Sequence, residues 1–184
     1  GPIMLAWLLS LGILVFQRDL GSSLLFFGLF VVVLYVATER PGWVIVGGFL
    51  FLGGAWLGHL AFDHVQRRVS AWLDPWANPE QNYQIIKALY GMAHGGVLGR
   101  GWGEGRPNLT PFSFSDFILT SLGEELGLTG LMAVLMIYLL IVERGVRIAL
   151  TCRDAFGKLL AIGLTASFAF QVFVVAGGVT KLIP

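Results

Sequence analysis

Long runs of apolar residues constrain the fold of this chain more than any other feature of its sequence. Residues 21–37, 43–62 and 159–179 contain no Asp, Glu, Lys or Arg, and residues 117–142 contain only two acidic side chains. A helix that crosses the hydrocarbon core of a bilayer needs about 20 such residues, within a range of about 17–25. A fifth run, residues 2–16, is shorter. These lengths predict about five transmembrane helices, and the runs lack the alternation that barrel strands need.

The overall composition supports a membrane protein. Hydrophobic residues make up 56% of the chain and charged residues only 12%, whereas a soluble domain has roughly 25% charged residues. The net charge of +1 gives no electrostatic basis for binding nucleic acid. The single cysteine, Cys152, excludes an internal disulfide. We therefore predict an all-α polytopic membrane protein, with residues 1–184 forming a single membrane domain.

Loop charges predict the orientation of the chain. Residues 143–158 hold four basic and two acidic side chains, and a basic excess near membrane ends is typical of a cytoplasmic loop. Alternation then places residues 38–42 inside, and residues 17–20 and the long loop 63–116 outside. The long loop has five basic and five acidic residues, so it carries no competing bias. Asp19 should therefore share the extracytoplasmic side with the long loop.

The long loop contains two segments with helical periodicity. Apolar and basic residues alternate at helical spacing from His64 to Leu73, which predicts a helix in the headgroup region with Trp72 and Trp76 as interfacial anchors. The pair Asp74-Pro75 should end this helix. Residues 84–93 predict a second short amphipathic helix.

Glycines then follow in close succession over residues 95–105, a segment called here the glycine comb. Glycine adopts positive φ readily and lets the backbone approach a ligand closely, which directs attention to Gly101 and Gly103. The comb could form a backbone nest for phosphate oxygens, with Arg67, Arg68, Arg100 and Arg106 as counter-charges. Contact of these arginines with lipid headgroups is the alternative.

Four acidic residues are candidates for chemistry, and each has an ordinary structural alternative. Asp19 lies between two apolar runs and Asp116 lies before a third, so either could cap a helix. An acid among aromatic residues at a membrane boundary should be partly desolvated, which suits Asp116 to act as a general base. Glu124 and Glu125 lie further along, with Glu124 near the same helix face as Asp116. Glu124 and Glu125 either face a cavity or a partner within the span or remain at headgroup level, where the helix dipole stabilises their negative charge.

Several motifs together resemble those of the SEDS proteins of bacterial cell-wall synthesis, the RodA, FtsW and SpoVE group. They are QRDLG at residues 17–21, RVSAWLDP at 68–75, YQ at 83–84 followed by GGVLGRGWG, and SDFILTSLGEELG at 115–127. The resemblance covers nearly the whole chain, and the QRDLGSS form is more similar to RodA than to FtsW. Members have about ten spans of roughly 20 residues each. We therefore expect this chain to be the central to C-terminal part of a longer protein. It departs from the family in one further respect, because the family's C-terminal PFxSYGG-type motif is not in its sequence.

The resemblance implies an enzyme that polymerises lipid II, the undecaprenyl-pyrophosphate-linked precursor, into glycan strands during cell elongation or division. It implies a multi-pass protein of the bacterial cytoplasmic membrane with an extracytoplasmic active site, paired with a class B penicillin-binding protein. The family's essential acid matches Asp116, its QxDLG acid matches Asp19, and its acidic pair matches Glu124 and Glu125. A lipid II transporter or flippase, or a non-catalytic cell-wall scaffold, is the alternative.

From these patterns we expect Asp116 to be the catalytic base. The expected substrate-binding residues are acids, cations and glycines of the same region: Asp19, Arg68, Asp74, Lys87, Gly101, Gly103, Arg106, Glu124 and Glu125. No organic cofactor is expected. A divalent cation, Mg²⁺ or Mn²⁺, could assist departure of the pyrophosphate, but the sequence identifies no ligands for it.

Overall fold

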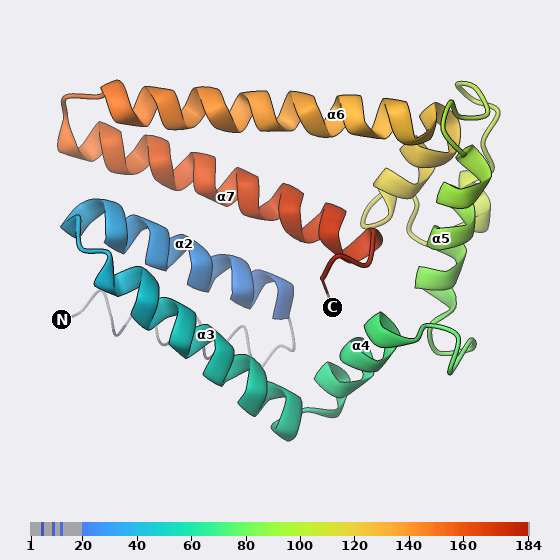
Figure 1. Cartoon of the computed structure of the whole chain (residues 1–184), viewed down its shortest axis with the longest axis horizontal. Coiled ribbons are helices and arrows are strands. Elements are labelled where there is room, and N and C mark those ends of the chain that lie inside the picture. The colour runs from blue at the N-terminus through green and yellow to red at the C-terminus, as the bar shows by residue number, and fades with distance from the viewer. Residues whose placement is uncertain (1–4, 6–8, 10–11, 13–19, 184) are drawn as a thin grey trace. The chain divides into compact units, whose positions relative to one another are not determined.

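A computed structural model describes Leu5, Leu9, Gly12 and residues 20–183 of the chain, and Figure 1 shows its helices in order. The predicted span 2–16 falls almost wholly outside these described residues, and so does Asp19. The described part is helical and contains no strand. Its elements are α2 (Leu20–Thr38), α3 (Gly42–Ala61), α4 (Asp63–Leu73), α5 (Tyr83–Gly95), the short 3-10 helix η1 (Pro107–Leu109), α6 (Ile118–Thr151) and α7 (Ala155–Val179).

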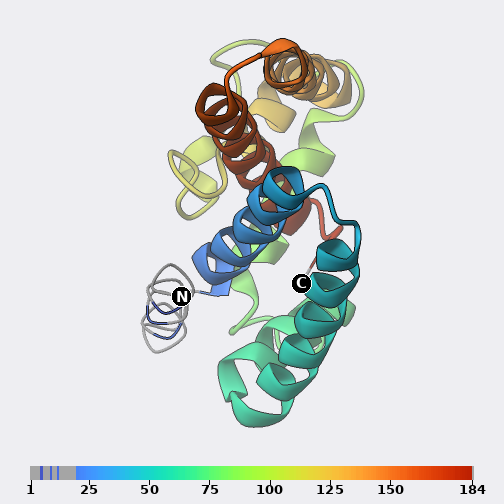
Figure 2. The same cartoon turned by 90° about the vertical axis from the view of Figure 1, so that its left-hand side faces the viewer.

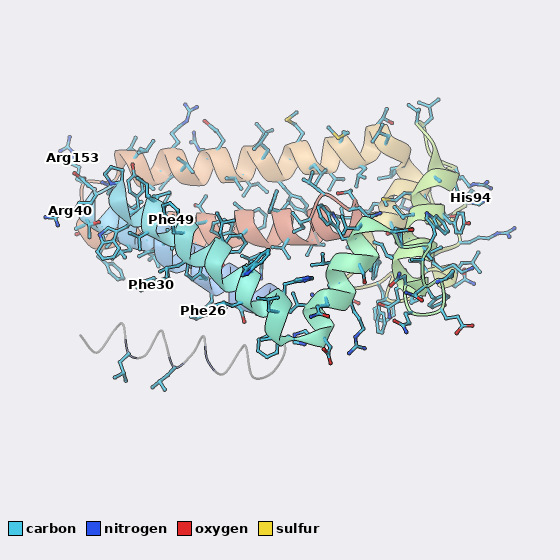
Figure 3. The ribbon with its side chains drawn as sticks, turned by 60° about the horizontal axis from the view of Figure 1, so that its bottom comes forward. Phe26, Phe30, Arg40, Phe49, His94 and Arg153 are labelled. Carbon is cyan, nitrogen blue, oxygen red and sulfur yellow. The ribbon has the colours of Figure 1, made fainter. Side chains whose placement is uncertain are left out.

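Three of these helices, α3, α6 and α7, are long and apolar enough to cross a membrane. Within α2, residues Ser22–Thr38 form a shorter apolar helix. Many large apolar side chains on these helices are exposed, such as Phe26 and Phe49, labelled in Figure 3. Such exposure is expected where lipid rather than water surrounds a helix. The prediction of an all-α polytopic membrane protein is confirmed.

Helix α6 extends further than the sequence suggested. The predicted loop 143–158 is mostly helical, because α6 continues to Thr151 and α7 begins at Ala155. The ion pair between Glu143 and Arg147, one helical turn apart, favours this extension. A helix can continue beyond the apolar core of a bilayer, so the charged residues that ended the apolar run did not end the helix.

The chain forms two compact units, of which the first comprises Gly1–Gly54 and Ile141–Gln171. Within this unit α2 lies between α3 and α7 (Figures 1 and 2). Glycines allow the close approach, since a Cβ on Gly47 would lie 2.8 Å from Val31, and one on Gly28 would lie 3.2 Å from Phe170. The phenyl rings of Phe27 and Phe51 pack with centroids 6.5 Å apart.

The α2–α3 and α6–α7 connections lie at the same end of the first unit. Figure 3 shows Arg40 and Arg153, one from each connection, at this end. The Lys158 ammonium lies 3.5 Å from the Glu39 carboxylate. This exposed ion pair contributes little free energy of folding, but it shows the two segments to be neighbours. This proximity agrees with the alternation of spans, which places both segments on one side of the membrane.

The second unit comprises Ala55–Leu140 and Val172–Pro184, and it contains the long polar loop. Helices α4 and α5 confirm the two predicted amphipathic helices, with α5 slightly longer at each end. A cluster of buried apolar residues, Leu119, Leu131 and Val179, joins the start of α6 to the end of α7. The indole N–H of Trp72 donates a hydrogen bond to the Lys181 carbonyl at 2.9 Å, which ties α4 to the C-terminal residues.

Candidate functional site

The described candidate site residues all belong to the second unit, where the glycine comb packs against the start of α6. Helix α6 is broken at Gly127, whose φ of 69° and ψ of −172° are not helical. The residues Ile118–Leu126 therefore form a separate helical segment ahead of the long span. This segment carries both acidic residues of the predicted pair.

Positive φ angles in the comb confirm the conformational prediction for its glycines. Gly101 has φ 115° and Gly103 has φ 79°, and Gly96 and Gly99 also have positive φ. The two predicted positions differ in their surroundings. The Gly101 amide donates a hydrogen bond to the Glu125 carbonyl at 3.0 Å, whereas a Cβ on Gly103 would meet no atom within 4 Å. Gly103 is therefore constrained by backbone conformation and not by close packing within the described residues.

Glu124 is buried against α5, with only 7% of the residue exposed. It shares this interior with Thr110 and with Thr120, which is 1% exposed and whose hydroxyl has no partner among the described residues. Gly91 of α5 makes room for the group, because a Cβ there would lie 2.7 Å from Thr120 Cγ2 and 3.4 Å from Thr110 Oγ1. Burial favours a supporting role for Glu124 over direct contact with a large substrate.

Glu125 points toward the comb. A Cβ on Gly105 would lie 2.8 Å from Glu125 Cγ and 3.2 Å from its Oε1, so the carboxylate lies beside the comb backbone. Glu125 is partly exposed. Glu124 and Glu125 are adjacent in sequence but face different surroundings, and only Glu125 is placed to meet a ligand on the comb.

Asp116 lies in the series of turns, residues 111–117, that precedes α6. Its side chain is exposed and has no hydrogen bond or ion pair within the described part of the chain. It therefore does not cap α6 in this structure. One expectation is corrected: Asp116 does not share a helix face with Glu124, because the helix begins only at Ile118.

Three basic side chains of the long loop likewise have no hydrogen bond or ion pair within the described part of the chain. Arg68, Lys87 and Arg106 are exposed, and the ion pairs found among the described residues all lie in the first unit. Arg100 differs, because its guanidinium donates a hydrogen bond to the His94 carbonyl at 3.3 Å. Figure 3 shows His94 extending outward from α5. Unpaired cations near a membrane surface can bind anionic groups.

Asp74 has a structural partner. Its carboxylate accepts a hydrogen bond from the Trp76 amide at 2.9 Å, a turn that follows the end of α4. The indole of Trp76 in turn packs edge-on against the Tyr90 ring of α5, with centroids 5.6 Å apart. Asp74 therefore shapes the turn after α4, and its contact with substrate stays a prediction.

The described residues contain no group of three or more His, Cys, Asp and Glu side chains that could hold a metal ion. Mg²⁺ is often held by one or two carboxylates together with substrate phosphates. A tightly bound resident metal therefore does not fit the described part of the site, and no chemical step is assigned to one.

Sequence reasoning missed the glycines that bring α5, the comb and α6 together. Gly91, Gly95 and Gly99 recur every four residues and face the start of α6. Gly91 and Gly95 lie one turn apart on the same face of α5, and this spacing was the signal that could have revealed them. Gly127 carried no comparable signal, because it lies inside a continuous apolar run.

The sequence matches a known protein family over its whole length. The model of the FtsW/RodA/SpoVE family, described as cell cycle proteins, matches residues 1–184. The chain belongs to this family. The match spans the exposed Asp116, the glycine comb and the acidic pair.

Individual relatives bear names of cell-wall enzymes. The chain is 49% identical over 184 residues to the peptidoglycan glycosyltransferase RodA of Mycobacterium tuberculosis, covering all of this chain and 39% of the relative. It is 47% identical to RodA of Mycobacterium leprae, covering 40% of that protein. It is 38% identical over 186 residues to the probable peptidoglycan glycosyltransferase FtsW of Geobacter metallireducens, covering 50% of it. Identity to these RodA proteins is higher, which confirms the RodA-like resemblance, and the chain spans about two fifths of their length.

Proposed function

We propose that the longer protein containing this chain polymerises lipid II into glycan strands. The match of the family model to all 184 residues carries this proposal, and relatives at 47–49% identity are named peptidoglycan glycosyltransferases. The exposed and unpartnered Asp116 supplies the group that the reaction requires. A class B penicillin-binding protein would crosslink the product.

The proposed reaction is an inverting glycosyl transfer. A hydroxyl of one lipid-linked sugar attacks the anomeric carbon of another, and the bond from that carbon to the pyrophosphate breaks. Asp116 takes the proton from the attacking hydroxyl, which is the function of a general base. One carboxylate suffices, because inversion requires no covalent intermediate on the enzyme.

The departing pyrophosphate carries negative charge that must be stabilised in the transition state. The unpaired side chains of Arg68, Lys87 and Arg106 are the cations of the loop suited to this task. The comb backbone around Gly103, which the Gly101 amide holds on α6, would position the sugars together with Glu125. Asp19, which lies outside the described residues, is proposed to position substrate or bind a cation.

A polymerisation assay with the purified full-length protein tests the proposal. Incubation with lipid II should yield glycan polymer in the absence of any other glycosyltransferase. A parallel reaction with EDTA shows whether a divalent cation takes part. A protein that moves lipid II across vesicle membranes without forming polymer would instead be the transporter considered above.

We also propose that the loop 63–116 and Asp116 lie on the extracytoplasmic side. The basic excess near the α6–α7 connection supports this orientation. In a Cys152→Ser background, a cysteine introduced at the exposed Asn78 should react with a membrane-impermeant thiol reagent in intact cells. A cysteine introduced at Arg153, the matched control in the α6–α7 connection, should react only after permeabilisation. The reverse pattern would invert the orientation and remove the site from its substrate.

A further inference from the structure

The break in α6 changes the hydrogen bonds of four backbone groups. In an uninterrupted α-helix the amides of Leu128 and Thr129 would donate to the carbonyls of Glu124 and Glu125. Here the Leu128 amide donates to the Gly96 carbonyl at 3.0 Å, and the Thr129 amide donates to the Val97 carbonyl at 3.1 Å. The break therefore frees two amides and two carbonyls of α6 for use outside the helix.

The freed carbonyls also bond to the comb. The Arg100 amide donates to the Glu124 carbonyl at 3.1 Å, and the Gly101 amide donates to the Glu125 carbonyl at 3.0 Å. All four groups released by the break thus find partners within residues 96–101. The Thr129 hydroxyl adds a fifth bond, to the Val97 carbonyl at 3.0 Å. Because unpaired backbone groups inside a membrane protein are costly, the break and the docked comb depend on each other.

Two glycines make this docking sterically feasible. A Cβ on Gly127 would lie 2.5 Å from the Val97 carbonyl oxygen and 2.7 Å from the Leu98 carbonyl carbon. A Cβ on Gly99 would lie 2.6 Å from the Leu126 carbonyl carbon. These neighbours are backbone atoms that cannot rotate away. Gly127 also needs its φ of 69° with ψ near 180°, a region open almost only to glycine.

We propose that Gly127 is a positioning residue for glycosyl transfer, because its backbone breaks α6 and fixes the comb against the acidic pair. The proposal rests on the glycosyltransferase function proposed above. Docking places the comb glycine Gly105 beside the Glu125 carboxylate and holds the Gly101 amide on α6. Gly127 itself touches no substrate, so it acts through the comb.

The test measures hydrogen–deuterium exchange and steady-state polymerisation kinetics for variants of the full-length protein. Gly127→Ala should accelerate hydrogen–deuterium exchange at least tenfold in peptides covering residues 96–101 and 124–129. It should raise the KM for lipid II at least tenfold with little change in kcat, as expected when binding contacts are lost. Gly58→Ala is the matched control, because Gly58 lies in α3 and a Cβ there meets no atom within 4 Å.

A milder pair of variants keeps the test decisive if Gly127→Ala does not fold. Thr129→Val removes only the hydroxyl bond to Val97 and should raise exchange and KM about threefold, the change in equilibrium expected for roughly 0.7 kcal/mol of a lost hydrogen bond. Thr129→Ser should restore both values.

Unchanged exchange in Gly127→Ala, or faster exchange with an unchanged KM, would overturn the positioning proposal and leave the glycosyltransferase intact. If the wild-type protein binds lipid II without polymerising it, the proposed function fails. In that case the Kd for lipid II replaces KM, and an unchanged Kd in Gly127→Ala would overturn the positioning of the comb as well.

Discussion

Asp116→Asn should abolish glycan polymerisation by the full-length protein, with a loss of about 10²–10⁴-fold in rate, the range typical for removal of a general base. Asparagine keeps the size of the side chain but cannot take the proton. The Asp116 side chain is exposed and makes no hydrogen bond or ion pair with the described residues, so the substitution breaks no such interaction among them. Expression, thermal stability and lipid II binding should therefore remain near wild type.

A matched control separates this effect from general damage. Glu80→Gln serves this purpose, since Glu80 is an exposed acid of the same loop and should be replaceable without loss of rate. Retention of more than about a tenth of the wild-type rate lies far above the range for a lost base. The base would then lie elsewhere, with Asp19 the next candidate.

The local features of the fold were predictable from the sequence. The amphipathic segments α4 and α5 were recognised because their apolar and basic residues repeat at helical spacing, and Asp74-Pro75 correctly marked the end of α4. The positive φ angles of Gly101 and Gly103 followed from the density of glycines. In each case the signal is a pattern within about a dozen residues, where the helical period is directly visible.

The features that escaped prediction depend on partners far away in sequence. The burial of Glu124 depends on Gly91 of α5, which lets that helix approach the start of α6 about thirty residues later. The break at Gly127 was invisible within a continuous apolar run, since its hydrogen-bond partners lie about thirty residues earlier and periodicity reports only local structure. Asp116 was expected on a helix face, yet the turns of residues 111–117 lead it outside α6.

The close approach of α5 and α6 leads to the second large expected effect, on stability. Gly95→Ala should lower the free energy of unfolding by about 3 kcal/mol, the upper part of the usual range for overpacking. A Cβ on Gly95 would lie 2.7 Å from Glu124 Cα and 2.8 Å from the Glu124 carbonyl oxygen, and it would also collide with the Gly123 carbonyl oxygen. These atoms belong to the backbone of α6, so the end of α5 would have to move away.

Thermal or denaturant unfolding of the full-length protein in detergent measures this cost. Gly58→Ala is again the control, because it adds the same methyl group to a helical glycine with open space around it. That control should leave stability unchanged or raise it by roughly 0.5–1 kcal/mol, since alanine is the better helix former. Displacement of α5 would also withdraw Gly91 from Glu124 and the comb from Glu125, so polymerisation should fall together with stability. If Gly95→Ala and Gly58→Ala have the same free energy of unfolding, then α5 does not pack against the backbone of residues 123–124. The close approach of α5 would then not explain the burial of Glu124.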